Sequence, residues 1–383
     1  MATLTNLIPD AYVALDVVSR ELTGMIPAVM RDAKADRAAV GQVVRSAIAP
    51  ANTAADITAA MTPPTPANQT IGNKSLTITK SRYAAFGWNG EEERGLNNGG
   101  PGVLTIQQDQ IAQAMRTIVN EVEADLLALH ISASRAYGTA ATTPFATDLS
   151  DPANIRKILD DNGAPPSDRH LIINTTAGAK MRTLAQLTKA NEANDATLLR
   201  QGVLLDIHGF SVRESAQVVT STAGTAASAT TNAAGYAVGA TLLTLASAGT
   251  GTLVAGDVVT FAGDTNKYVI ASGDTDVSNG GTITLAEPGL RVAMSAAAKA
   301  ITVIAAATRN LAFTRNAFAL AARQPALPMN GDLATDRTSI TDPRSGLTFE
   351  LALYPGFRMT NYFIGMAWGV AAMKPEHSAI LLG

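Results

Sequence analysis

Apolar positions in the first half of the chain repeat at the spacing of one long amphipathic helix. Between residues 105 and 137 they recur every three or four positions, which keeps them on one stripe of a helix. The members of the stripe are Ile111, Met115, Ile118, Val122, Leu126, Leu129 and Ala133. Thr105 is the expected cap and Gly138 the expected terminator. At ~1.5 Å per residue this helix is about 48 Å long, longer than most globular helices.

Three shorter stretches also have helical patterns. Apolar residues at mixed spacings predict an amphipathic helix in residues 10–30. Residues 151–163 begin with an Asp-Pro pair and end at a glycine, which is the usual asymmetry of a helix. A further helix is expected after the capping pair Thr175 and Thr176, which follows a buried strand at residues 171–173. This part of the chain is therefore α+β in character.

Strand patterns flank the helical region. Residues 76–88 are predicted to be extended, and a glycine-rich loop at residues 95–102 is predicted to follow them. Near the C-terminus, residues 349–353 alternate between apolar and polar and lead to a turn expected at residues 354–356. Residues 357–370 then resume extended structure.

A proline-rich stretch interrupts these elements at residues 47–72. Proline prevents regular helix and removes the backbone donors that a central strand needs. The prolines are Pro50, Pro63, Pro64 and Pro66. A segment of this length without periodic structure is uncommon inside a compact domain. We therefore expect it to leave the core as an extended excursion that reaches another subunit.

The composition changes at about residue 220. Residues 220–235 are almost all Ser, Thr, Ala, Gly and Asn, which is typical of a flexible connection between domains. From residue 236 to 304 the apolar positions alternate with period two between turn signals. The pattern predicts a small all-β unit inserted in the chain.

Bulk composition narrows the class of protein. The 383 residues are enough for two or three domains, and a charged fraction of only 16% indicates much buried or subunit-covered surface. The net charge of -3 gives no general attraction to nucleic-acid phosphates. There is no cysteine, which excludes disulfides and thiolate chemistry. The N-terminus does not have a signal-peptide pattern, and the longest apolar stretch, residues 362–373, is shorter than a membrane span.

The search for catalytic chemistry gives no candidate. The histidines stand apart in sequence, without zinc-site spacing. They are His130, His170, His208 and His377. The carboxylates at residues 91–93 are expected on a solvated loop, and the Lys-Ser pair at residues 74–75 lacks the glycines of a phosphate loop. We therefore predict no catalytic, cofactor-binding or metal-binding residues, no cofactor and no enzymatic activity.

Read in order, these elements resemble the major coat protein of tailed bacteriophages, which has the HK97-like fold. The closest resemblance is to the P22-type branch, whose coat carries an inserted domain. The segments that carry it are residues 76–88 leading into 105–137, then 169–173, 202–212, 311–320 and 368–374. The resemblance implies an α+β, HK97-like capsid fold with an inserted all-β domain.

The resemblance also implies a division of the chain into named parts. These are an N-terminal arm (1–46), an E-loop (47–75), a peripheral domain (76–150) with a spine helix (105–137), the first part of an axial domain (151–220), the inserted β domain (221–305) and a return segment to the axial and peripheral domains (306–383). One branch of the superfamily joins a lysine of the E-loop to an asparagine of another subunit. Lys74 and Asn361 are the candidates for this crosslink here. The alternative interpretation is that Lys74 lies on an exposed strand.

The partners and location follow from the same resemblance. The chain is expected to assemble with itself into hexamers and pentamers of an icosahedral shell, with a scaffolding protein, a portal and in some cases a decoration protein. Packaged double-stranded DNA is expected to be contacted weakly, and no membrane is involved. The shell is expected to be assembled in the cytoplasm of a host bacterium and to end as the capsid of the virion.

Two other functions fit parts of the sequence. The β unit at residues 236–304 is similar to modules of surface proteins, which suggests a phage tail or adhesion component. An enzyme of an unrecognised class requires a cleft with converging carboxylates. Electron microscopy of the purified protein distinguishes shells from fibres and from particles of a few subunits.

Overall fold

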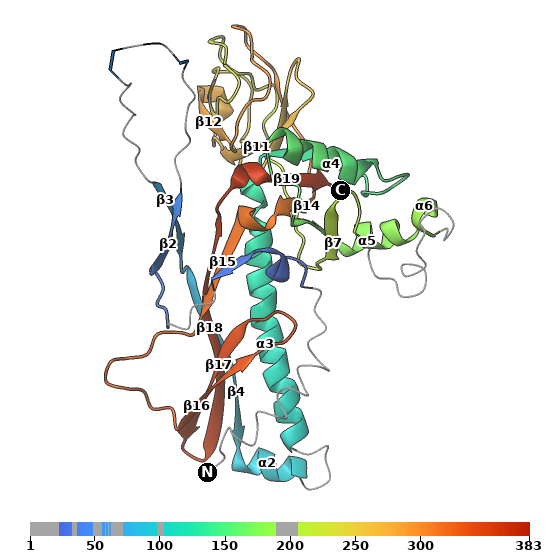
Figure 1. Cartoon of the computed structure of the whole chain (residues 1–383). Coiled ribbons are helices and arrows are strands. Elements are labelled where there is room, and N and C mark those ends of the chain that lie inside the picture. Colours follow the sequence, from blue (N-terminus) through green and yellow to red (C-terminus); the bar gives the residue numbers. More distant parts are fainter. Residues whose placement is uncertain are drawn as a thin grey trace.

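The computed structural model describes residues 23–32, 37–48, 56–57, 59, 61–62, 72–97, 103–188 and 206–383. In this part of the chain one long helix, α3 (Val103–Leu127), runs along a six-stranded sheet and ends near an eleven-stranded sheet (Figure 1). A two-stranded hairpin projects to one side. The fold is α+β, as the sequence predicts.

The six-stranded sheet covers one side of α3. Its strands are β1 (Met30–Asp32), β4 (Lys80–Asn89), β15 (Phe318–Arg323), β16 (Asp336–Thr341), β17 (Thr348–Gly356) and β18 (Met359–Ala372). The order is β1-β15-β18-β17-β16, and β4 pairs with β18 along ten residues. Residues 349, 351 and 353 of β17 are buried in the same core as the stripe of α3, so the period of two predicted for residues 349–353 is confirmed. The predicted extended structure of residues 357–370 is also confirmed from Met359 onward, as strand β18.

Polar contacts fix the helix on this sheet. The indole N–H of Trp368 donates to Asp125 on α3 at 2.9 Å, and Lys80 donates to the other oxygen of the same carboxylate at 2.7 Å. Further along, the indole N–H of Trp88 donates to Gln110 at 2.9 Å. Because both tryptophans lie on the sheet and both acceptors on α3, these bonds fix the register of the helix against the strands.

The prediction that the helix extends to residue 137 is wrong. α3 ends at Leu127, a 3-10 turn follows (η2, Ala128–Ser132), and residues 135–137 form strand β5 (Arg135–Tyr137). β5 pairs in parallel with β19 (Ser378–Leu382) and antiparallel with a strand of the β unit. Strand pairing on both edges satisfies the backbone hydrogen bonds of residues 135–137. Ala133 is buried here as the apolar stripe predicted, so the spacing alone did not reveal that the helix ends earlier. The helix is therefore about 37 Å long.

The eleven-stranded sheet forms the other half of the molecule. Its central strands run in the order β5-β19-β14-β6-β7, with β14 (Ala307–Thr314), β6 (Arg169–Ile173) and β7 (Phe210–Glu214). The helices α4 (Ser150–Asp161), α5 (Thr175–Arg182) and α6 (Ala185–Thr188) lie beside it. The predicted threonine pair does not cap α5. The side chain of Asn174 accepts the N–H of Ala177 at 2.8 Å and is the cap.

The β unit has its own hydrophobic core. Its strands are β9 (Leu242–Leu245), β10 (Val258–Phe261), β11 (Lys267–Ser272), β12 (Gly281–Leu285) and β13 (Ile301–Val303). The chain enters and leaves it side by side, because β8 (Thr220–Ser221) pairs with the start of β14. The unit is also joined to the larger sheet, since β11 pairs with β5.

Three other sequence predictions need correction. Residues 220–235 are not a flexible connection: Ala229 and Thr231 are almost completely buried, and Thr231 bridges to Leu245. The carboxylates at 91–93 lie on a short helix, α2 (Gly90–Asn97), and not on a loop. The turn expected at residues 354–356 lies two residues later, because β17 continues to Gly356 and Arg358 has the positive φ of 58°.

At the N-terminal end, most of the helix predicted for residues 10–30 lies outside the described residues. The part that is described has a 3-10 turn at Ile26–Ala28 (η1) and then strand β1. Pro27 fits the start of this turn and prevents a longer helix there. None of the helices in the described ranges is long and apolar enough to cross a membrane.

Candidate assembly surface

The predicted excursion begins as a regular hairpin. β2 (Val43–Ile48) and β3 (Gly72–Thr77) pair antiparallel from Val43 opposite Thr77 to Ile48 opposite Gly72. The paired residues therefore begin at Val43, before the predicted E-loop at residues 47–75, and end at Thr77, after it. Figure 1 shows β2 and β3 rising away from the six-stranded sheet. Among the described residues no third strand pairs with either edge, and a two-stranded hairpin alone is marginally stable, so its root needs support from the body.

A small apolar cluster supplies that support. Leu76 and Ile78 are buried against the alanines of β15 and β18. The N–H of Thr79 donates to the carbonyl of Trp368 at 3.0 Å. A side chain at Gly369 would place its Cβ 2.0 Å from the carbonyl oxygen of Thr77. Glycine is therefore required at 369, and the hairpin root lies in direct contact with β18.

Beyond the ladder, the described residues of the excursion expose apolar side chains completely. Ile57 has a relative exposure of 103% and Met61 of 105%. Residues 63–71, which hold three of the prolines, lie outside the described residues. Exposed apolar side chains on a projecting segment are typical of a contact with another molecule.

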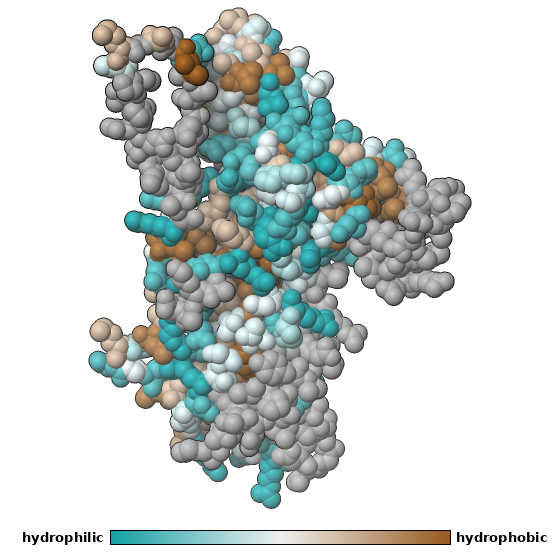
Figure 2. All heavy atoms as spheres, viewed as in Figure 1, coloured by the Kyte–Doolittle hydropathy of each residue, from teal (hydrophilic) through white to brown (hydrophobic). Residues whose placement is uncertain are grey.

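The opposite end of the molecule exposes a second apolar group. Met329 and Leu333 on the loop between β15 and β16 are almost fully exposed, as is Phe357 at the turn between β17 and β18. Figure 2 shows apolar side chains at the excursion tip, upper left, and on this protruding loop, lower left. Among the described residues the large apolar side chains with the highest exposure, Ile57, Met61, Met329, Leu333 and Phe357, lie on these projecting segments.

A buried carboxylate attaches the N-terminal segment to the spine helix. Glu123 is 1% exposed and accepts the backbone N–H groups of Gly24, Met25 and Ile26 at 2.8, 2.7 and 3.0 Å. These donors are the free N–H groups at the start of η1. Burial raises the pKa of Glu123, and its hydrogen bonds to the backbone and to Ser215 oppose that rise. This contact holds residues 24–26 against α3.

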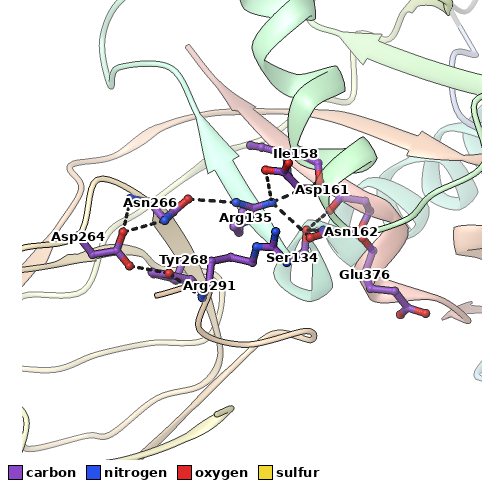
Figure 3. Close-up of polar contacts among 11 residues, drawn as sticks. Ser134, Arg135, Ile158, Asp161, Asn162, Asp264, Asn266, Tyr268, Arg291 and Glu376 are labelled. Atoms are coloured by element: carbon purple, nitrogen blue, oxygen red, sulfur yellow. Dashed lines mark hydrogen bonds and ion pairs between the residues drawn. The ribbon is translucent and has the colours of Figure 1, made fainter. Parts of the chain in front are cut away.

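A second buried charge joins the β unit to the rest of the sheet (Figure 3). Arg135 on β5 is 3% exposed and donates to Asn266 in the β unit at 3.0 Å. On its other side it donates to the carbonyl of Ile158 at 3.3 Å and contacts Asp161 at 3.4 Å, both on α4. One side chain thus connects the unit, the sheet and a helix.

We call the contacts of Arg135 with Asn266 and with α4 the joint of the β unit. The residues around this joint are also hydrogen-bonded to one another. Asn266 donates to Asp264, and the hydroxyl of Tyr268 donates to the second oxygen of that carboxylate at 2.6 Å. Burial and the Asp264 carboxylate raise the pKa of Tyr268 to about 12, so the hydroxyl keeps its proton. The backbone N–H of Arg291 donates back to the same hydroxyl. The network gives the β unit one orientation on the sheet.

The histidines lie on different elements of the fold, with His130 on η2, His170 on β6, and His208 and His377 outside the strands. His130 contacts the carbonyl of Leu127 at the end of α3, and burial lowers its pKa. His170 on β6 contacts Asp168, which Arg315 also holds at 2.7 Å. His208 has a positive φ at a turn before β7. In the described ranges no group of three or more His, Asp or Glu residues could hold a metal ion.

The two crosslink candidates lie on different elements. Lys74 on β3 donates to the backbone carbonyl of Met373, at the far end of β18. Asn361 lies near the start of β18, opposite Gly87 and Tyr354. Within one chain they are not brought together, and a bond between subunits remains a proposal.

The two buried charges, Glu123 and Arg135, were not predicted, and only Glu123 had a weak signal in the sequence. Glu123 falls four residues after the buried Val119, so it is a carboxylate on the apolar side of the helix. Arg135 lies just past the apolar stripe, inside the predicted 105–137 helix, and nothing in the sequence pattern marked it. Its role depends on strand β11, which is more than a hundred residues away in sequence.

Comparison with known proteins gives a fold-level match. No protein-family model and no curated protein matches this chain. Among solved structures, the capsid of the cyanophage P-SCSP1u is similar over 95% of this chain and 88% of that chain, with a TM-score of 0.50 and 11% identity. The chain has an HK97-like capsid fold. At this identity the similarity establishes the fold and not the details of any surface.

Two further solved structures resemble this capsid fold. A protein of Mycobacterium phage Che8 covers 89% of this chain and 84% of its own, with 12% identity and a TM-score of 0.46. The capsid protein of a native GTA particle covers 95% and 90%, with 7% identity and a TM-score of 0.47.

Proposed function

We propose that this chain is the major capsid protein of a tailed bacteriophage and that it assembles with itself into the icosahedral shell around the genome. The observation that carries the proposal is the capsid fold, which extends over 95% of the chain in the comparison with the cyanophage capsid. The projecting β2–β3 hairpin and the exposed apolar side chains at its tip support a role in subunit contacts. The role is structural and not enzymatic.

The parts of the fold take the following roles in this proposal. The hairpin is the E-loop, α3 is the spine helix, and the six-stranded sheet is the core of the peripheral domain. Residues 151–220 and part of the return segment 306–383 form the axial domain. Residues 221–305 form the inserted β domain, which the paired β8 and β14 close at its base. Residues 1–46 act as the N-terminal arm, which Glu123 holds against α3 at residues 24–26.

The partners belong to the same proposal. Hexamers and pentamers of the chain close the shell, with a scaffolding protein during assembly, a portal at one vertex and, in some shells, a decoration protein outside. Assembly takes place in the host cytoplasm and the product is the virion capsid. A crosslink between Lys74 and Asn361 of different subunits is a further, separate proposal, tested by mass spectrometry of assembled shells.

Packaged double-stranded DNA is contacted only weakly. The net charge is -3 and the sequence has no cluster of Lys and Arg, so few counterions are released on binding. We expect no sub-micromolar binding of the purified chain at physiological salt. Tight binding with a steep salt dependence in a DNA titration contradicts this interpretation of the surface.

Deletion of the excursion tests the assembly role. We expect the full chain to sediment as large particles and a variant without residues 61–72 to sediment as folded subunits, because this stretch has no apolar face to bury in its own core. Circular dichroism of the variant checks that it is folded. Particles of normal size and heat resistance from the variant contradict the proposal.

A further inference from the structure

A groove lies on the face of the six-stranded sheet that points away from α3. Side chains on a strand alternate between the two faces. In β4 and β18 the residues packed toward α3 include Phe86 and Trp368. Tyr83 and Phe363 have the opposite parity and therefore lie on the outer face, where they line the groove with Tyr354 of β17.

Aromatic rings form the walls of this groove. The ring centroids of Tyr83 and Phe363 are 5.1 Å apart, and those of Tyr354 and Phe363 are also 5.1 Å apart, the second pair edge to face. The loop after β15 covers one side, and its Pro325 lies over Gly365 on the floor. The cavity has a volume of about 190 Å³. Tyr83 remains 67% exposed, so one wall is available to a ligand.

The charges near the groove are already paired. Glu350 contacts Arg37 and Arg337, and Asp332 contacts Arg337 and the hydroxyl of Tyr354. The groove therefore presents aromatic and neutral surface with few free charges. An uncharged ligand fits this groove better than an acidic or basic peptide. A charged ligand would lose water around its charges and find no free opposite charge to pair with.

One segment of the chain has this chemistry. Between Asp56 and Lys74 the sequence has no charged residue, and it contains Thr-Pro-Pro-Thr-Pro at positions 62–66. Prolines fix their own φ and bias the preceding residue toward extended structure, so this run favours the polyproline II conformation. Polyproline II segments with two prolines three residues apart dock in aromatic-lined grooves at a low entropy cost. Pro63 and Pro66 have this spacing.

The segment belongs to a different copy from the groove. Figure 1 shows β2 and β3 leading away from β4, β17 and β18, which carry the groove. The described tip residues Ile57 and Met61 are fully exposed in their own chain. The stretch between Ile48 and Gly72 is long enough to reach outward, since about 11 residues on each side span up to ~36 Å when extended. A neighbouring chain is therefore the geometrically available receptor.

We propose that residues 62–66 of one subunit dock as a polyproline II segment in the groove formed by Tyr83, Tyr354 and Phe363 of a second subunit. The inference rests on the proposed shell and adds which surface receives the excursion and by what chemistry. The paired aromatics supply flat apolar walls for the proline rings, and the neutral groove selects for an uncharged segment.

The chain contains no cysteine, so engineered cysteines can map this contact directly. Shells are assembled from an equal mixture of a Thr65→Cys chain and an affinity-tagged Ser81→Cys chain and are then oxidised mildly. Ser81 lines the groove and is exposed, so this change keeps the three aromatic walls. We expect a disulfide-linked pair of one tagged and one untagged chain on a non-reducing gel. The control replaces Ser81→Cys by Val238→Cys, an exposed position on the β unit, and should give at least ~tenfold less linked pair. Equal yields from both mixtures, or no linked pair from shells that form, overturn the inference.

A second measurement applies even when no shell forms, and so separates this inference from the proposed function. A fluorescent peptide with the sequence of residues 59–69 is titrated into the full-length chain and followed by anisotropy. We expect binding that weakens at least ~tenfold when the three prolines are changed to alanine or when the chain carries Tyr83→Ser. Tyr83 is largely exposed, so its replacement leaves the fold intact. Equal affinity of the proline and alanine peptides overturns the inference.

Discussion

At the scale of single residues, two buried charges hold segments that are distant in sequence. Glu123 binds the three backbone N–H groups that begin η1, and Arg135 joins β5 to the β unit and to α4. Removal of a buried charge leaves its partners without hydrogen bonds, which costs more than the loss of an exposed pair. Both residues are therefore expected to contribute strongly to stability.

Replacement of Glu123 tests the attachment of the N-terminal segment. We expect Glu123→Ala to lower the free energy of unfolding by about 2–4 kcal/mol, because three buried N–H groups lose their acceptor. Glu121→Ala on the same helix is the matched control, since Glu121 pairs with Arg82 at the surface and should cost less than about 1 kcal/mol. Both free energies of unfolding are measured by urea denaturation in the variant without residues 61–72, which is expected to stay as single subunits. Equal costs for the two variants contradict the role of Glu123.

Replacement of Arg135 tests the joint of the β unit. We expect Arg135→Ala to cost about 3–5 kcal/mol and to increase hydrogen exchange in residues 264–268, because Asn266 and the α4 carbonyl lose a common donor. Arg156→Ala is the control, since Arg156 is half exposed and pairs with Asp160 within α4. Unchanged exchange in residues 264–268 of the Arg135 variant shows that the joint does not depend on this side chain.

The sequence predicted few of these individual roles. The histidines and the carboxylates at 91–93 were the candidates for a site, whereas the buried charges that join distant segments are Glu123, within the apolar stripe, and Arg135, just past its end. Asn174 was missed as the cap of α5 because two threonines follow it at equally good positions. Residue roles depend on which distant backbone comes close, and a local pattern does not contain that information.

At the scale of elements, local sequence patterns predicted helices and strands correctly where one face of the element is buried. They were wrong where pairing with a distant strand determines the structure. The strands at residues 349–353 and 171–173 and most of the spine helix were predicted, because their alternation or periodicity reflects one buried face. The end of the helix was wrong because β5 pairs with β19 and β11, whose sequences lie far away. The small-residue stretch at 220–235 was also misassigned, since Ala and Thr pack in the β unit as readily as they form linkers.

The root of the excursion depends on a glycine in β18. We expect Gly369→Ala to destabilise the subunit by about 1–3 kcal/mol and to disturb the β2–β3 root, because the new Cβ meets the backbone of Thr77 at 2.0 Å. Gly72→Ala at the start of β3 is the control, since no atom lies within 4 Å of its Cβ position. Thermal unfolding and the yield of assembled particles report both effects. A Gly369 variant as stable as the Gly72 variant contradicts the close approach.

The β unit is expected to fold without the rest of the chain. It has a separate core that includes Phe261, Tyr268 and Ile283, and its two ends are adjacent. At about 85 residues it exceeds the size below which disulfides or metals are usually needed. Residues 221–305 expressed alone should give a dispersed amide spectrum and a cooperative melt. Unfolded spectra from several versions with staggered ends argue against an independent domain.

At the scale of the whole molecule, the described chain combines a packed body with projections. α3 and two sheets form the body, and the hairpin, the loop after β15 and the turn after β17 project from it with exposed apolar side chains. The order of elements along the sequence was sufficient to suggest a capsid fold, and the structural comparison agrees. The contacts between subunits could not be predicted from one sequence, because each depends on a surface that only a second copy completes.

Electron cryomicroscopy of the purified, full-length chain under assembling conditions tests the central claim most directly. The account predicts closed particles of uniform size with icosahedral symmetry. In their subunit density α3 lies along the six-stranded sheet, and the β2–β3 hairpin extends over a neighbouring subunit. Fibres, tail-like tubes or particles of only a few subunits would contradict it.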